Sequence, residues 1–391
     1  MRSFKADYVF PVSTTPIKNG IVTVDGFGKI ISVTDQNSYQ ETNNEPVEHI
    51  HGIICPGFIN THCHLELSHL KGKVAQRTGL VSFIKDIQKS RHADAVEINE
   101  AATRADDEMY ENGIVAVGDI ANTNMSIPIK AGSKLYYHSF IECFGFSPEK
   151  ANQVFDNALA LLKEFAPQSC SITPHAPYSV SKELFKLIDD YCERGKNLIS
   201  IHNQECADEN KFYRYKQGSF IDLYADLGID ISWFKQQARN SLQSIIRLLS
   251  TEQDILMVHN TFTNLKDIYF LKRFDHKVHW CFCPNANLYI ENKLPKIELF
   301  ANQGANLTLG TDSLASNSKL CILSEMRTLQ QHFPVLTTAR LIEWGTINGA
   351  RFLGIDDEKG TLEAGKTPGL NLITGLDGLK ITPDSKVKRL L

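Results

Sequence analysis

Short apolar runs alternate with longer stretches of helical period through most of the chain. The runs are rich in Val, Ile, Leu and Phe, and the stretches between them carry apolar residues every three or four positions. This alternation predicts strand–helix units repeated around a parallel sheet. Eight such runs are present, at residues 52–59, 114–117, 135–141, 170–173, 198–201, 255–258, 278–282 and 305–309. Eight units predict an α/β fold of the (β/α)8 or TIM-barrel type over residues 55–355.

The two ends of the chain have a different pattern. Strand-like pieces lie at residues 20–24, 29–33, 360–366 and 370–373. The first two flank Asp25-Gly26, which is a strong signal for a hairpin turn. The last two are separated by proline and glycine. We therefore expect residues 1–54 and 356–391 to form one small β-sandwich domain beside the barrel.

The composition is that of an ordinary globular protein. Hydrophobic residues make up 42% and charged residues 22% of the 391 residues, and the formal net charge is −4. No basic run of five residues is present, which argues against a nucleic-acid partner and favours a small molecule. Nine cysteines without a CxxC pair are typical of reduced, intracellular thiols. The charged N-terminus and the lack of a long apolar run predict a cytoplasmic protein that does not enter membranes.

Polar side chains gather where the predicted strands end. They are His62, His64 and Glu66 after the first run, then Asp119, Glu142, His175, His202, Glu205, His259 and Asp312 after later ones. Catalytic groups of a TIM barrel lie at the carboxyl ends of its strands, so these side chains should face one another. His62 and His64 are two residues apart on an extended segment, so one metal ion can be held by both imidazoles. Each histidine alone could be an ordinary hydrogen-bonded residue, but together they predict a metal site.

Five motifs, in order, resemble those of the amidohydrolase superfamily. They are residues 56–64 (PGFINTHCH), 202–205 (HNQE), 259–262 (HNTF), 283–288 (CPNANL) and 309–313 (LGTDS). The set is similar to that of the branch with cytosine, guanine and methylthioadenosine deaminases and triazine hydrolases, including aminofutalosine deaminases. The resemblance covers nearly the whole chain. The Ala-Asp-Leu that usually follows the family's tail motif is Pro368-Gly369-Leu370 here, so the sequence leaves open whether the tail completes the β-domain.

The resemblance implies a hydrolase with a single divalent metal ion. The implied ligands are His62, His64, His202 and Asp312. Zn²⁺ is the preferred ion, with Fe²⁺ and Mn²⁺ as alternatives that also accept imidazole and carboxylate ligands. Relatives with two ions bridge them through a lysine near the end of the fourth strand, where this chain has Ser171-Ile-Thr-Pro-His175. One ion is therefore expected.

The resemblance also implies the catalytic groups. Glu205 stands where related deaminases place the acid that moves a proton to the ring nitrogen and then to departing ammonia. His259 would polarise the attacking water or the developing oxygen, and Asp312 would also accept a proton from that water. An amine must be protonated to leave, whereas chloride need not be, so Glu205 favours cleavage of a carbon–nitrogen bond. The alternative is an exposed glutamate at the start of a helix.

Substrate contacts are the least defined part of the site. The resemblance places His175 against the substrate, although a buried structural histidine is an equal alternative. Glu66 and Glu142 are further candidates for substrate binding, and Glu66 could equally be a loop residue. The interval 206–254 is long for one strand–helix unit and contains several aromatic residues. It could form a lid over a flat substrate or a helical insertion on the surface.

Together these patterns predict a metal-dependent aminohydrolase with a small heterocyclic substrate. A purine or an adenosine- or aminofutalosine-type nucleoside would be converted to the oxo product and ammonia. One alternative keeps the fold and metal but hydrolyses a triazine chlorine, a cyclic amide or an imidazolone. Another is a non-catalytic barrel that binds partners, but such a protein would be expected to have lost ligands, and none is missing. A homodimer is compatible with this class of barrel.

Overall fold

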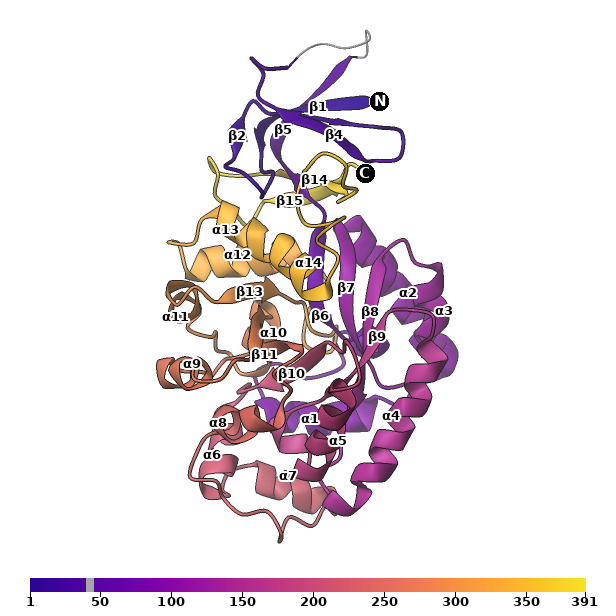
Figure 1. The fold of residues 1–391 in the computed structure, drawn as a ribbon, viewed down its shortest axis with the longest axis vertical. Coiled ribbons are helices and arrows are strands. Elements are labelled where there is room, and N and C mark those ends of the chain that lie inside the picture. The colour runs from indigo at the N-terminus through magenta and orange to yellow at the C-terminus, as the bar shows by residue number, and fades with distance from the viewer. Residues whose placement is uncertain (40–45) are drawn as a thin grey trace.

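Three sheets organise the part of the chain that the computed structural model describes, residues 1–39 and 46–391. Two are four-stranded and parallel, with orders β6-β7-β8-β9 and β10-β11-β12-β13. Helices follow their strands along the chain, which confirms the predicted α/β class. The third sheet has seven strands and contains both ends of the chain (Figure 1).

The eight parallel strands agree with the apolar runs, with one correction at the start. They are β6 (Phe58–Cys63), β7 (Ile114–Ala121), β8 (Tyr136–Cys143), β9 (Cys170–Pro174), β10 (Ile199–Asn203), β11 (Asp254–His259), β12 (Lys277–Phe282) and β13 (Asn306–Leu309). The expected run 52–59 is divided at Gly57, because β5 (Val47–Pro56) belongs to the seven-stranded sheet and β6 starts the first parallel sheet. A Cβ at Gly57 would lie 2.2 Å from Val115 Cγ1, so the chain passes between the two sheets at a point where only glycine fits.

Two seams bring the parallel sheets together. At one seam β9 lies beside β10, and the backbone N–H of His202 donates to the carbonyl of His175 over 2.9 Å. At the other seam β13 lies beside β6, and the N–H of Thr311 donates to the carbonyl of His62 over 3.0 Å. The carboxyl ends of the strands from both sheets therefore meet in one region.

Helices cover the parallel sheets and the ends of their strands. They are α1 (Leu80–Ser90), α2 (Ala95–Glu111), α3 (Ile127–Gly132), α4 (Ala151–Phe165), α5 (Lys182–Cys192), α6 (Ala207–Tyr215), α7 (Phe220–Asp226), α8 (Ser241–Ile245), α9 (Leu265–Leu271), α10 (Pro284–Ile290), α11 (Ile297–Asn302), α12 (Ile322–His332), α13 (Thr338–Trp344) and α14 (Ile347–Leu353), with short 3-10 turns η1 (Leu65–Leu70), η2 (Pro148–Lys150), η3 (Pro177–Ser179) and η4 (Ile246–Leu248). Ser181 caps α5, because its Oγ accepts the N–H of Leu184. No helix within the two described ranges combines the length and apolar character needed to cross a membrane.

The seven-stranded sheet joins the two ends of the chain. Its path is β15-β14-β5-β1-β3-β4, with β2 paired to β1. The remaining bounds are β1 (Arg2–Val9), β2 (Ile17–Lys18), β3 (Ile21–Val24), β4 (Ile30–Thr34), β14 (Leu370–Thr374) and β15 (Lys386–Arg389). The predicted hairpin is confirmed by the antiparallel pairing of β3 and β4. The tail pairs as well: β14 runs antiparallel to β5, and Phe4, Val22, Ile54 and Leu370 share one buried cluster.

Candidate active site

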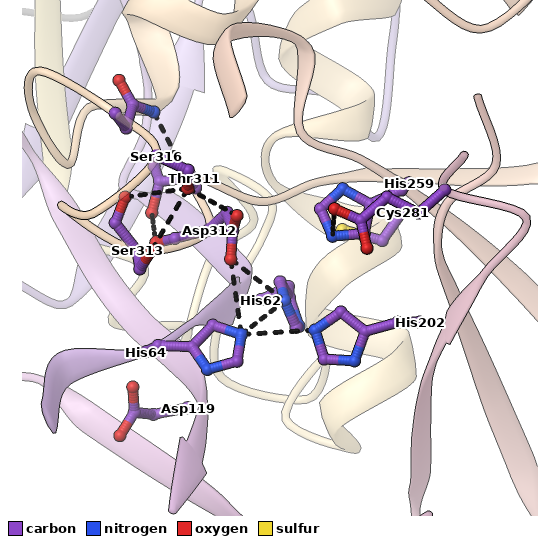
Figure 2. A network of polar contacts seen from close by, with 12 residues as sticks. His62, His64, Asp119, His202, His259, Cys281, Thr311, Asp312, Ser313 and Ser316 are labelled. Atoms are coloured by element: carbon purple, nitrogen blue, oxygen red, sulfur yellow. Dashed lines mark hydrogen bonds and ion pairs between the residues drawn. The ribbon is translucent and has the colours of Figure 1, made fainter. Parts of the chain in front are cut away.

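Four side chains from three strand ends converge on one point. His62 and His64 come from the end of β6, His202 from β10, and Asp312 from the loop after β13. His64 Nε2 lies 3.1 Å from His62 Nε2 and 3.3 Å from His202 Nε2. Asp312 Oδ1 lies 3.3 Å from His64 Nε2 and 3.6 Å from His62 Nε2. Figure 2 shows the four side chains pointing toward one another.

These spacings fit a divalent metal ion. Ligand nitrogens around a tetrahedral zinc ion are about 3.3 Å apart, given Zn–N distances of about 2.0–2.1 Å. His202 Nδ1 donates to the carbonyl of His175 over 2.8 Å, so its Nε2 presents a lone pair to the centre. Burial and the neighbouring imidazoles lower the pKa of His64 to about 3 and that of His202 well below its usual value. Neutral imidazoles of this kind are the form that binds metal.

Asp312 supplies the negative charge of the centre. Burial alone would raise its pKa, but the hydrogen bond with His62 and the charge of neighbouring imidazoles such as His64 hold that pKa well below its usual range. Ser316 Oγ donates to Asp312 Oδ2 over 2.6 Å, which leaves Oδ1 facing the imidazoles. The carboxylate is thus ionised and oriented.

Glu205 and His259 form a second pair beside this centre. His259 Nε2 lies 3.6 Å from Glu205 Oε1, and both side chains are buried. His259 Nδ1 donates to Asn287 Oδ1 over 2.9 Å, so the proton of the neutral ring is on Nδ1 and Nε2 is free to accept one. Burial raises the pKa of Glu205 well above its usual value and lowers that of His259 to about 4. The pair therefore combines a carboxyl group whose pKa is raised with an imidazole that is uncharged near pH 7.

Four residues at these strand ends have left-handed backbone. The φ angles are 46° at Gln204, 69° at His259, 58° at Asn260 and 57° at Asp312. Residues other than glycine adopt this region at a cost and retain it only where the surroundings hold them there. These turns orient the side chains of His259 and Asp312, and that of Glu205 just after Gln204, toward the same point.

A pocket of about 470 Å³ opens onto the centre. Eight of the nine site residues predicted from the sequence line it: His64, Glu66, Glu142, His175, His202, Glu205, His259 and Asp312. The ninth, His62, is fully buried beneath them. One wall is mostly apolar: α1 contributes Phe83 and Ile84, α7 contributes Leu223, and Leu227 directly follows α7. The pocket can thus enclose a flat polar ring together with a bulkier group.

The two further carboxyl groups are linked through one asparagine. Glu66 accepts the N–H groups of Asn122 and Thr123 over 3.2 Å each. Asn122 Nδ2 donates to Glu142 Oε2 over 3.2 Å, and Glu142 Oε1 lies 3.8 Å from His202 Nδ1. Burial raises the pKa of Glu142 to about 8. Both groups therefore border the pocket between the histidines and the loop after β7.

His175 is also held in place beside the pocket. Its Nδ1 lies 2.6 Å from Ser179 Oγ, and its ring packs against the ring of His202 with centroids 4.8 Å apart. Burial and the charge of neighbouring imidazoles lower its pKa to about 4. The ring is therefore neutral. It lines the pocket and also packs against the ring of His202.

The long interval 206–254 contributes a wall and a small aromatic core. Phe212 stacks on Phe234 with ring centroids 4.6 Å apart, and both rings pack against Phe146. Phe212 and Phe234 are buried and do not line the pocket. Leu223 and Tyr224 of α7 do line it, as do Leu227 and Ile229 just after this helix. Lys85 on α1 forms an ion pair with Asp226 at the end of α7 over 2.5 Å.

The Asp119–Lys130 ion pair and Glu325 are buried near the site but belong to no sequence motif. Asp119 forms a fully buried ion pair with Lys130 over 2.7 Å and accepts the N–H of Leu65 over 2.8 Å, which fixes the backbone just after His64. The sequence placed Asp119 at a strand end but said nothing of Lys130. Glu325 on α12 is fully buried and was not predicted at all. Its acidic character on an amphipathic helix predicts an exposed side chain, so no local signal could have found it.

A buried group of three imidazoles and a carboxylate, next to an acid–base pair in a pocket, defines a metal-dependent hydrolase. Residues 53–389 match the sequence model of the amidohydrolase family, and the chain belongs to that family. The resemblance of the sequence motifs is thereby confirmed.

Individual relatives are similar over most of the chain. An adenosine deaminase from Helicobacter pylori is 26% identical over 330 residues, which cover 82% of this chain and 78% of the relative. A crystal structure of Helicobacter pylori aminofutalosine deaminase superimposes with a TM-score of 0.77 at 20% identity and covers 96% of this chain and 93% of that one. An adenosine deaminase from Xanthomonas campestris with bound zinc gives a TM-score of 0.74 at 21% identity, covering 95% and 84%.

Proposed function

We propose that this protein is a metal-dependent aminohydrolase of amino-substituted nitrogen heterocycles. The substrate class is a purine or an adenosine- or aminofutalosine-type nucleoside, which reacts with water to give the oxo product and ammonia. The observation that carries the proposal is the buried pair of Glu205 and His259, 3.6 Å apart, in the pocket that opens onto the four converging donors. The Helicobacter pylori relatives, an adenosine deaminase and an aminofutalosine deaminase, support this class of substrate.

One divalent ion, preferably Zn²⁺, belongs to the proposed site. Its ligands would be His62, His64, His202 and Asp312, whose donor atoms are 3.1–3.6 Å apart where they approach one another. Such an ion, when bound, lowers the pKa of a coordinated water to about 7 and supplies a nucleophile at neutral pH. The zinc in the Xanthomonas campestris adenosine deaminase supports this choice.

The chain's own groups then move the protons. Asp312 is ionised and can accept the first proton of the attacking water. His259 can accept a hydrogen bond from that water at Nε2, because Asn287 holds the ring proton on Nδ1. Burial raises the pKa of Glu205 well above its usual value, so this group can give a proton to the ring nitrogen. Glu205 can then take the remaining proton of the added hydroxyl group and pass it to the departing ammonia, while the proton held by Asp312 returns Glu205 to its starting state.

Glu66, Glu142 and His175 are the proposed substrate contacts. All three border the pocket within reach of a ring bound against the centre. The apolar wall of α1 and α7 would enclose the group attached to that ring. A substrate with both a polar ring and an extended substituent fits this division.

The same proposal includes the architecture expected from the sequence. The two parallel sheets, which meet at the β9–β10 and β13–β6 seams, would close into a (β/α)8 barrel over residues 55–355. Residues 1–54 and 356–391 would form the small β-sandwich, supported by the pairing of β14 with β5. The nine free cysteines support a cytoplasmic location.

A substrate panel tests the reaction. Zinc-loaded protein would be mixed with adenosine, an aminofutalosine, guanine, cytosine and a chlorotriazine, while ammonia, chloride and the ultraviolet spectrum are followed together. Ammonia release from an aminopurine is expected, with no chloride. Removal of the metal with a chelator should abolish turnover, and one zinc ion per chain should restore it. Chloride release in place of ammonia, or full activity after metal removal, would contradict the proposal.

A further inference from the structure

Glu325 connects α10, which follows β12, with the loop after β13. It stands in the first turn of α12, and its side chain is fully buried. It does not border the pocket. Burying a carboxyl group is costly unless hydrogen bonds compensate it, so the partners of Glu325 identify what it holds.

Three donors, from α10 and from the loop after β13, meet the two oxygens of Glu325. Oε2 accepts the backbone N–H of Asn285 over 2.9 Å. Oε1 accepts the side-chain amides of Asn285 and Asn317, each over 2.8 Å. Asn285 is in α10, which follows β12, and Asn317 is in the loop after β13. One carboxyl group therefore fastens the ends of two neighbouring strands.

The loop after β13 connects Glu325 to Asp312. Asn317 Nδ2 donates to the carbonyl of Thr311 over 2.9 Å as well as to Glu325. Thr311 directly precedes Asp312, whose φ of 57° is in the left-handed region. Such a conformation persists only where neighbouring contacts hold it. The contact chain from Glu325 through Asn317 thus supports the turn that aims the Asp312 carboxylate.

Helix α10 connects Glu325 to His259. Asn287 lies two residues after Asn285 on α10 and accepts the Nδ1 proton of His259 over 2.9 Å. Its own amide donates to Thr261 Oγ1 over 2.9 Å. The place of α10 therefore decides which nitrogen of His259 carries the proton and where Nε2 points.

We propose that Glu325 is a positioning residue that holds Asp312 and His259 in fixed relation to each other. The inference rests on the proposed function for the roles of those two residues. A carboxyl group suits the position because all three approaching groups are N–H donors. A glutamine there would turn its own NH2 group toward at least one of them.

The test compares the wild type with Glu325→Gln in two measurements that do not depend on turnover. The first is zinc affinity, measured by competition with a chelator, which reports the place of Asp312. The second is the imidazole Nδ1–H resonance of His259 in zinc-loaded, isotope-labelled protein, assigned with His259→Gln. Glu325→Gln should weaken zinc binding about 10- to 100-fold, as loss of a group that orients a ligand does, and should shift or remove the resonance.

Two further variants keep the test decisive. Asn317→Ala removes only the contact toward Asp312, so it should weaken zinc binding about tenfold and leave the His259 resonance in place. This holds even if Glu325→Gln does not fold. Asp106→Asn is the control, because Asp106 is also buried and accepts two hydrogen bonds, from Ser133 and Tyr137, but away from the pocket. It should change neither measurement.

Wild-type zinc affinity and an unchanged His259 resonance in Glu325→Gln would overturn the positioning role. Equal losses in Asp106→Asn would overturn it too, since they would report general loosening. If the wild type deaminates no aminopurine while Glu325→Gln changes both measurements, the proposed function is wrong and the positioning role stands.

Discussion

At the scale of single residues, the site is made by burial. Glu205 and the imidazoles around it are all removed from water, and burial moves their pKa values in opposite directions, upward for the acid and downward for the histidines. An acid that keeps its proton and bases that stay neutral can therefore coexist at one pH. This division is what proton transfer between water and a leaving amine needs.

Glu205→Gln should lower kcat by about 10²- to 10⁴-fold, because the amide cannot deliver the proton to the leaving group. KM should change little, since the amide has the same size. The initial rate of ammonia release measures the effect. Glu164→Gln, which alters an exposed glutamate of α4, serves as the control. Equal rates for Glu205→Gln and the wild type would rule out the proton-transfer role.

His138 predicts a pH dependence of stability away from the site. It lies on β8 between Ser169 and Ser171, and burial, with the nearby charges of Lys130 and Lys196, lowers its pKa from 6.5 to about 3. Between these values the unfolded chain binds a proton that the folded chain does not. The free energy of unfolding should therefore fall as the pH falls through this window, by up to about 1.4 kcal/mol per pH unit from this residue.

His138→Gln should reduce the slope of unfolding free energy against pH by up to about 1.4 kcal/mol per pH unit, which corresponds to one proton. Urea unfolding at several values between pH 4 and 6.5 measures it. His332→Gln, which removes an exposed imidazole, should keep the wild-type slope. Identical slopes in all three proteins would show that His138 is not neutral in the folded state.

At the scale of elements, the close approach of β13 to β6 constrains the site. A Cβ at Gly310 would lie 2.8 Å from His62 Cβ and 2.9 Å from Cys281 Sγ. Both neighbours are buried and belong to strands, so neither can move away easily. Only the hydrogen atom of the Gly310 side chain fits in this space. The distance between the strand that carries His62 and the loop that carries Asp312 therefore depends on a glycine at this position.

Gly310→Ala should destabilise the protein by about 1–3 kcal/mol through overpacking. It should also weaken zinc binding, because His62 is displaced. Urea unfolding and chelator competition measure the two effects. Gly132→Ala, at the end of α3 with open space around the added methyl group, should show neither loss. An unchanged zinc affinity in Gly310→Ala would mean that the seam can shift without moving His62.

The strands were predictable because parallel strands are covered on both faces and read as continuous apolar runs. The same property hid the border between β5 and β6, since both are apolar there and a single glycine separates them. The site residues were predictable because they follow strands directly. Glu325 and Lys130 were not, because their burial depends on what distant loops bring to a helix, and no local pattern records it. The two possibilities for the interval 206–254, a lid and a surface insertion, could not be separated for the same reason: Phe212 and Phe234 pack in a small core, whereas Tyr224 lines the pocket.

At the scale of the whole molecule, the tail fastens the terminal sheet to the parallel sheets. Arg389 on β15 donates from Nε to the carbonyl of Tyr110 over 2.8 Å and also contacts the carbonyl of Ile114 at the start of β7. Its guanidinium lies 3.9 Å from the centre of the Tyr110 ring. One side chain thus links the last strand of the chain to α2 and β7.

Arg389→Ala should lower the free energy of unfolding by about 2 kcal/mol, because it removes hydrogen bonds from a charged group to two backbone carbonyls. Urea unfolding followed by circular dichroism measures the change. Lys388→Ala alters the exposed neighbour on the same strand and should cost much less. Similar losses in the two variants would show that the link contributes little.

The pairing of β5 with β14 has a consequence for synthesis on the ribosome. Leu370 lies opposite Pro56, so nearly the whole chain must be made before β5 can meet its partner. At rates of roughly 5–20 residues per second, the waiting time is on the order of tens of seconds. During that time one edge of the nascent sheet lacks its neighbour and can pair with another chain. The waiting edge is the apolar stretch from Ile53 to Pro56, because Glu48, His49 and His51 keep only the first half of β5 polar and exposed.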